Sequence, residues 1–142
     1  LFSRRGFNIE SLAVGATEQK NMSRMTIVVT AEETPLEQIT KQLNKLIDVV
    51  KLSDLTEGAH IERELMLIKL RATGAQRDEI KRCADIFRGQ IVDVSSSLYT
   101  VLLTGTQQKL DAFIQAVGDA VILEVVRSGV AGIARGDRVL SP

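Results

Sequence analysis

The chain repeats one pattern of secondary structure, and this repetition constrains its fold more than any other feature. In the complete copy, an apolar helix stripe that ends at residues 86–89 (IFRG) leads directly into the strand-like residues 90–94. At the start of the chain, residues 1–6 (LFSRRG) lead in the same way into residues 7–14. Each copy continues with a second strand, a helix and a last strand. Two copies of one small unit predict two tandem α+β modules.

The second copy predicts a complete module with the order β-α-β-β-α-β. Its strands are expected over residues 65–70, 91–94, 99–103 and 122–126, and its helices carry stripes of Ile80, Cys83, Ala84 and Phe87, then Leu110, Phe113, Ile114 and Val117. This order is the split-βαβ or ferredoxin-like arrangement. Because its crossovers are right-handed, the first strand should lie between the third and the fourth. Gly89 is expected at C′, just past the first helix.

The first copy shows only the order α-β-β-α-β. Its first strand, over residues 7–14, loses its alternation near Glu10 and Ser11, which predicts a bulge. The later elements are a strand over 25–30, a helix over 36–47 that begins with the capping box of residues 34–37, and a closing strand over 49–52. The central strand of this module is therefore expected upstream of Leu1.

A polar segment between the copies marks the expected domain boundary. Residues 56–59 (TEGA) are typical of a linker, so we expect a first domain over 1–57 and a second over 62–142. Residues 127–142 combine three glycines and three arginines without a clear period. Two interpretations of this tail stay open, a mobile segment or one that becomes ordered against a partner.

Composition favours a soluble cytoplasmic protein. No apolar run approaches the ~18 residues that a membrane span needs. The 18 basic and 18 acidic residues balance to zero net charge and are well mixed, which gives no electrostatic footprint for nucleic acid or an anionic membrane. The single cysteine excludes an internal disulfide and fits a reducing compartment.

The sequence offers no recognisable catalytic constellation. The one histidine, His60, lies in the expected linker and is interpreted as a solvated side chain. With one cysteine and one histidine, no Cys/His metal site of ordinary spacing can form within the chain. We therefore expect a protein that is no enzyme and has neither catalytic residues nor a metal. Cys83 is expected to be a buried thiol, and solvated carboxylates are expected at Glu62, Glu64, Asp78 and Glu79.

A module that senses a small molecule or binds a protein is the class that remains, because the strands also lack the aromatic pair that RNA-binding versions of this fold use. Asn8, just past Gly6, carries a side-chain amide with donors and an acceptor. Such an amide can bind both the carboxylate and the ammonium of an amino acid. From the residues alone, the alternative stays open that Asn8 only caps the helix end or bonds the turn.

Long segments of the chain resemble the small regulatory subunit of acetohydroxyacid synthase, also called acetolactate synthase. The resemblance spans the chain and lies in residues 1–12, 23–27, 36–39, 42–46, 62–65, 79–80, 86–88, 110–113 and 127–130. It implies that the first module is an ACT domain, a ferredoxin-like unit that binds amino acids at a dimer interface. The first strand of that unit is missing from this sequence.

The resemblance also implies a function. The family's small subunit activates a separate catalytic subunit, which uses thiamine diphosphate, magnesium and FAD, and it confers feedback inhibition by valine in branched-chain amino-acid biosynthesis. The small subunit itself holds none of these cofactors. The alternative is a stand-alone amino-acid-sensing ACT-type scaffold without an enzyme partner, which co-purification with a large thiamine-diphosphate protein would distinguish.

Asn8 and Ile9 are the effector-binding residues that the resemblance implies. In the family, valine lies between two subunits of a homodimer. One subunit supplies the loop between its first strand and first helix, and the other supplies the start of its second strand. The second of these parts matches Asn8 and Ile9. The loop, which contains Asn and Gly, has no counterpart because the sequence starts after it.

Overall fold

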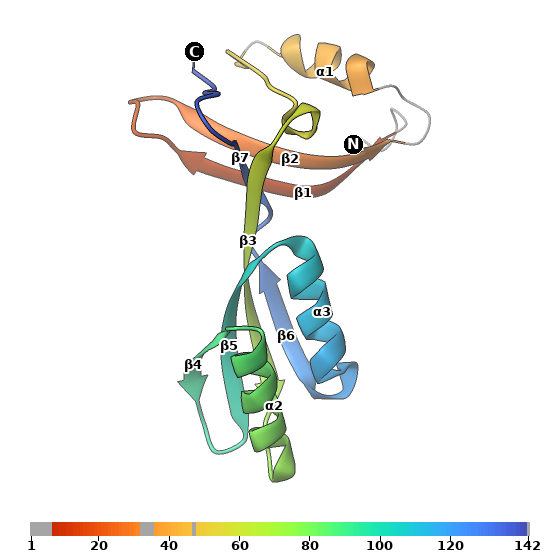
Figure 1. Ribbon diagram of the computed structural model, residues 1–142, viewed down its shortest axis with the longest axis vertical. Helices are drawn as coiled ribbons and strands as arrows, with labels where there is room; N and C mark the ends of the chain where they lie inside the picture. The colour runs from red at the N-terminus through yellow and green to blue at the C-terminus, as the bar shows by residue number, and fades with distance from the viewer. Residues whose placement is uncertain (1–6, 32–35, 47, 142) are drawn as a thin grey trace. The chain divides into compact units, whose positions relative to one another are not determined.

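A computed structural model describes residues 7–31, 36–46 and 48–141 (Figure 1). The chain divides into two compact units. The first unit comprises the described residues up to Glu62 together with those from Ala131 onward, and the second is Arg63–Val130. Among the described residues, no helix combines the length and the apolar character needed to cross a membrane.

The second unit has the expected β-α-β-β-α-β order. Its elements are β3 (His60–Arg71, which begins in the first unit), α2 (Ala75–Ile86), β4 (Gln90–Val94), β5 (Leu98–Gly105), α3 (Gln107–Val117), the short 3₁₀ helix η3 (Asp119–Val121) and β6 (Ile122–Arg127). The strands lie in the order β4-β5-β3-β6, and every pair is antiparallel. The first strand of the unit therefore lies between its third and fourth, which confirms the ferredoxin-like prediction.

The core of this unit lies between the sheet and its two helices, which cover one face (Figure 1). Along β3, alternate residues point into this layer and the others are more exposed. Phe113 on α3 is fully buried, and its ring meets that of Phe87 edge to face at a centroid distance of 5.4 Å. The partly buried Cys83 packs against the same core. The helix stripes predicted from the sequence are thus the core stripes of the fold.

The end of α2 differs from the prediction in one position. Phe87 is the C-cap, and Arg88 adopts the left-handed conformation with a φ of 60°. Gly89 therefore lies at C″, where its N–H donates to the carbonyl of Ala84 at 2.7 Å. A Cβ on Gly89 would stand 3.1 Å from Val101 Cγ1. The close approach to β5, and not a left-handed backbone angle, is therefore what favours glycine at this position.

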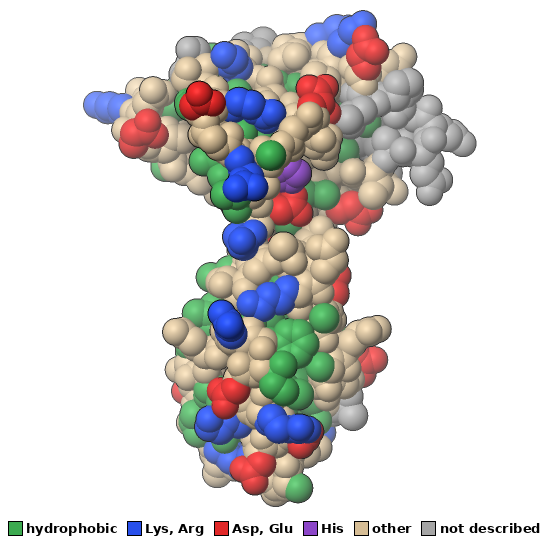
Figure 2. Space-filling view, in the orientation of Figure 1, with side chains coloured by type: hydrophobic (Ala, Val, Ile, Leu, Met, Phe, Trp, Pro, Cys, Tyr) green, Lys and Arg blue, Asp and Glu red, His purple; other side chains and the backbone are tan. Residues whose placement is uncertain are grey.

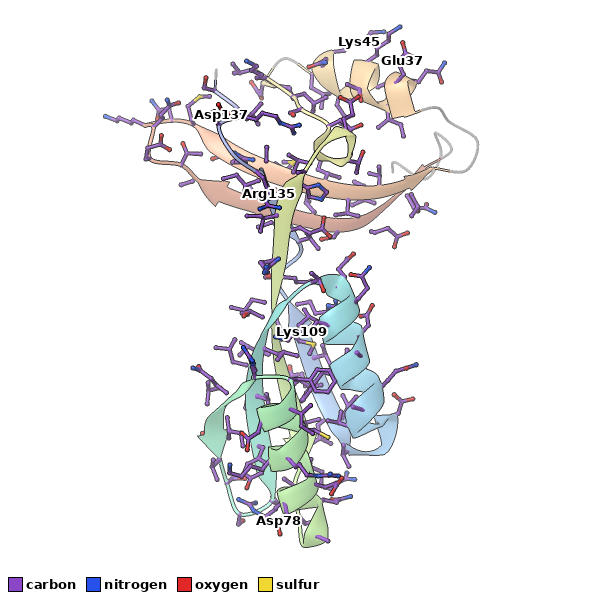
Figure 3. The ribbon with its side chains drawn as sticks, viewed as in Figure 1. Glu37, Lys45, Asp78, Lys109, Arg135 and Asp137 are labelled. Atoms are coloured by element: carbon purple, nitrogen blue, oxygen red, sulfur yellow. The ribbon has the colours of Figure 1, made fainter. Side chains whose placement is uncertain are left out.

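The first unit is built on the hairpin of β1 (Phe7–Ala16) and β2 (Ser23–Ala31). The register shifts between Ile9 and Ser11, which confirms the predicted bulge. The helix α1 (Leu36–Asn44) follows, and its Ile39 is buried. Figure 3 shows Glu37 of this helix and Lys45 just after it among the exposed side chains. The capping residues Thr34 and Pro35, like residues 1–6 and Ile47, lie outside the described residues.

The closing strand predicted over residues 49–52 is wrong, because these residues form no regular element. A strand exists only where its backbone pairs with a neighbouring strand. In the described part of the chain, no strand pairs with this segment, so its apolar residues alone do not make it one.

The expected linker is also more ordered than predicted. Its residues form the 3₁₀ helix η2 (Leu55–Glu57), which the Asp54 side chain caps by accepting from the Thr56 N–H at 3.0 Å. The strand β3 then begins at His60, five residues before the predicted start. The linker interpretation of His60 is therefore wrong, and this residue lies at the start of a strand.

The C-terminal segment contains a strand that neither interpretation of the tail predicted. β7 (Ala131–Ala134) pairs with β3, and Arg135, marked in Figure 3, donates its backbone N–H to the Ala59 carbonyl at 3.0 Å. On the hairpin side, Thr26 Oγ1 accepts from the Gly132 N–H at 3.2 Å, and Arg24 donates to the Gly132 carbonyl at 3.0 Å. For residues 131–134, the mobile-tail interpretation is wrong, because they are ordered against their own chain.

Candidate effector-binding site

Asn8 and Ile9 lie at the start of β1, where the hairpin register fixes their neighbours. Asn8 stands opposite Thr30, and Ile9 stands opposite Val29. The side chain of Asn8 is exposed, whereas Ile9 is half-buried. This alternation follows from the period of two along a strand, which sends successive side chains to opposite faces. The structure therefore presents the Asn8 amide to solvent beside a second polar residue.

A carboxylate at the bulge lies on the same hairpin face as Asn8. Glu10 is the residue at which the register shifts, and its Oε1 accepts a hydrogen bond from Thr30 Oγ1 at 2.8 Å. Since Thr30 is also the cross-strand neighbour of Asn8, the three side chains share one end of one hairpin face. Sequence reasoning found the bulge and Asn8 but missed the roles of Glu10 and Thr30. Only the cross-strand register reveals that these residues meet.

His60 lies in the first unit, where both ring nitrogens have a hydrogen-bond partner. Its Nδ1 is 3.2 Å from the carbonyl oxygen of Gly58, and its Nε2 is 3.0 Å from Oε2 of Glu62. The carbonyl of Gly58 and then the Glu62 carboxylate raise the pKa of His60 above its usual value of 6.5. Among the described residues, no group of three His, Cys, Asp or Glu side chains could hold a metal ion.

The paired acceptors around His60 predict its titration. A neutral imidazole can donate from only one ring nitrogen, whereas the imidazolium can donate from both. The pKa of His60 should therefore exceed 6.5 in the folded protein. The stabilisation is present below the unfolded pKa and is lost as pH rises through the folded value. Proton NMR can follow this ring alone, because the chain has one histidine. Glu62→Gln should lower the pKa, and a pKa at or below 6.5 in the parent protein would contradict the assignment.

Sequence reasoning missed an ion-pair cluster around the buried Glu64 in the second unit. Glu64 was expected to be solvated, but it is 5% exposed, so that prediction is wrong. Its carboxylate accepts from Arg127 Nη2 at 2.9 Å and from the Gly129 N–H at 3.1 Å. Arg127 also binds Asp111 on α3 at 2.7 Å. The cluster fixes the end of β6 to β3 and α3. The alternation of residues along β3 could have predicted that Glu64 is buried, because it places Glu64 on the same strand face as Met66 and Ile68.

Charged side chains of both signs lie on the described surface. Figure 2 shows Lys and Arg side chains interspersed with Asp and Glu side chains on the face that it draws. Several of these charges pair locally, as Lys81 does with Asp85 at 3.2 Å and Lys69 with Glu124 at 3.9 Å. This distribution agrees with the mixed charge pattern of the sequence.

The fold combines a unit built on a β-hairpin with a ferredoxin-like unit, and comparisons with known proteins specify the class to which such a chain belongs. Residues 1–51 match the family model of the AHAS small subunit-like ACT domain. Residues 63–136 match the model of the small subunit of acetolactate synthase. The chain belongs to the family of acetolactate synthase small subunits, which confirms the resemblance.

Individual relatives cover nearly the whole chain. The chain is 57% identical to the acetolactate synthase isozyme 3 small subunit of Escherichia coli over 141 residues, which are 99% of this chain and 86% of that protein. It is 54% identical to the acetolactate synthase small subunit of Mycolicibacterium smegmatis, over 97% of this chain and 81% of that one. The crystal structure of the small subunit from Thermotoga maritima matches with a TM-score of 0.83 at 38% identity, over 96% of this chain and 86% of the other.

Proposed function

We propose that this protein is the regulatory subunit of an acetolactate synthase, that it activates a separate catalytic subunit, and that it confers feedback inhibition by valine. The family membership carries the first part of this proposal. The exposed Asn8 amide in the ACT module, beside the half-buried Ile9, supports the last part. Thiamine diphosphate, magnesium and FAD would then be cofactors of the catalytic partner, and the complex would work in the cytoplasm.

Valine regulation of this kind requires a homodimer, which we include in the proposal. Asn8 and Ile9 would form half of the effector site, and the loop between the first strand and the first helix of a second subunit would supply the other half. The hairpin consists of β1 and β2 alone, so the outer edge of β1 carries backbone groups that no described strand pairs. Such edges favour pairing with another chain. Light scattering that shows a monomer at tens of micromolar would count against the dimer.

A ligand that binds across this interface would regulate by linkage. Valine held between two copies stabilises the arrangement of the dimer that binds it best. If the catalytic subunit is less active with that arrangement, valine inhibits it, and the coupling is equal in both directions for the binding steps. No catalytic residue is needed in the regulatory chain.

Reconstitution with the catalytic subunit tests the proposal. Acetolactate formation should rise when the protein is added to the catalytic subunit from the same organism, and valine should then reverse the increase. The catalytic subunit alone, with and without valine, is the control. If the protein neither co-purifies with the catalytic subunit nor alters its rate, a stand-alone amino-acid sensor becomes the better interpretation.

A further inference from the structure

We propose that Glu10 binds the ammonium group of the amino-acid effector and that Thr30 positions it. This inference rests on the proposed function, because it assigns a residue to the same effector site. It goes beyond Asn8 and Ile9, whose assignment comes from the family resemblance, because Glu10 and Thr30 are identified from the register and the hydrogen bonds of this hairpin.

The Glu10 carboxylate shares the hairpin face of Asn8, because Thr30 is the register partner of Asn8 and donates to Glu10. Without the shift between Ile9 and Ser11, Glu10 would occupy an ordinary position in the ladder. In the bulge, its side chain reaches across to Thr30, whose hydroxyl donates to Oε1 at 2.8 Å. Thr30 is in turn the register partner of Asn8. All three residues are exposed, so a ligand can reach them from solvent. Bulges commonly redirect a side chain in this way.

The charge of Glu10 fits the ammonium of an amino acid, to which the neutral amide of Asn8 can offer an acceptor but no opposite charge. A zwitterion presents one carboxylate and one ammonium, and a neutral amide can donate to the first without offering a charge to the second. A carboxylate supplies the opposite charge and has further lone pairs after it accepts one hydroxyl proton. Thr30 occupies Oε1 only.

The hydrogen bond from Thr30 leaves the charge of Glu10 without a cationic partner among the described residues. The carboxylates of Glu37, Glu62 and Glu64 each have a Lys, His or Arg partner within 4 Å. Among the described residues, no such ion pair is formed by Glu10, whose side-chain partner is the neutral hydroxyl of Thr30. The Glu10 carboxylate would therefore bind a cation more favourably than a neutral group. The α-ammonium of an amino acid held at the Asn8 amide is such a cation.

A pair of ligands and a matched pair of variants test this assignment. Calorimetry would measure the binding of valine and of 2-hydroxy-3-methylbutanoate, which replaces the ammonium with a hydroxyl. Glu10→Gln keeps the shape and the acceptor for Thr30 but removes the charge. It should weaken valine binding about ten- to a hundredfold, as expected for a lost charge-assisted hydrogen bond, and should leave the hydroxy acid nearly unchanged. Glu18→Gln, at an exposed carboxylate in the hairpin turn, should bind both ligands like the parent protein.

A second variant tests the positioning role of Thr30. Thr30→Val removes the hydroxyl that holds Glu10 but preserves a good strand former. It should weaken valine binding by less than Glu10→Gln does, again with little effect on the hydroxy acid. Circular dichroism of each variant would confirm that the hairpin unit is folded.

The possible results separate the inference from the proposed function. If Glu10→Gln binds valine as the parent does, or loses both ligands equally, Glu10 does not bind the ammonium, although valine regulation stands. If the parent protein binds no valine while it still activates the catalytic subunit, the proposed effector site fails and the inference fails with it. A loss of valine affinity that the hydroxy acid does not share would support both.

Discussion

Replacing Phe113 with alanine is expected to lower the free energy of unfolding of the second unit by about 3–5 kcal/mol. The Phe113 side chain is fully buried between α3 and the sheet. The substitution also removes its edge-to-face contact with Phe87. The loss combines the transfer free energy of the ring with the cost of the cavity that remains, because a close-packed core relaxes only in part. Such a loss is a large fraction of the 5–15 kcal/mol that stabilises a typical domain.

Tyrosine fluorescence during urea unfolding can measure this change in the second unit alone. The chain has one tyrosine and no tryptophan. Tyr99 lies on β5, where the Arg77 guanidinium stacks 4.5 Å from its ring centre. Ile86→Ala, at a position 65% exposed at the end of α2, is the control and should change the unfolding free energy by no more than about 0.5 kcal/mol. Equal midpoints for the two variants would show that Phe113 is not a core residue.

The topology of the second unit could be predicted because each of its elements carries its own signal. Strands with apolar runs alternate with helices whose stripes recur every three to four residues, and right-handed crossovers leave one strand order. The detail at Gly89 could not be predicted in the same way. A glycine after a helix suggests a left-handed angle, but its reason here is the approach of Val101 from another strand.

The errors in the first unit come from strands that depend on distant partners. Residues 49–52 have the composition of a strand, but composition does not supply a neighbour to pair with. β7 is the opposite case, because its sequence gives little indication of a strand and yet it forms one. The side chains of Arg24 and Thr26 hold it through hydrogen bonds to the backbone of Gly132. In both places, the pairing is a long-range property that local propensity does not contain.

The candidate site was predictable in part for the same reason. The chemistry of Asn8 can be read from its amide, and its place in an effector site comes from the family resemblance. The broken alternation near Glu10 predicted a bulge, which the register confirms. The hydrogen bond from Thr30 to Glu10 joins residues 20 positions apart, so it appears only once the two strands are aligned.

Replacing Asn8 with alanine is expected to relieve valine inhibition while activation of the catalytic subunit is largely retained. The variant removes an exposed amide from the start of β1 but no core contact, so the hairpin should remain folded. Loss of a hydrogen bond to a charged ligand group costs about 1.5–3 kcal/mol, which is roughly a ten- to hundredfold loss of affinity. Unlike Glu10→Gln, this change should weaken both valine and its hydroxy analogue, because both ligands carry the carboxylate.

Valine titration of the reconstituted enzyme would measure the effect. The valine concentration for half-inhibition should rise by that factor, while the rate without valine should stay close to that of the parent complex. Gln19→Ala is a suitable control, because Gln19 lies in the exposed turn between β1 and β2 and forms its hydrogen bonds with Thr17 through its backbone. An unchanged inhibition curve for Asn8→Ala would exclude Asn8 from the effector site. A loss of activation together with inhibition would place Asn8 instead at a surface that the catalytic subunit needs.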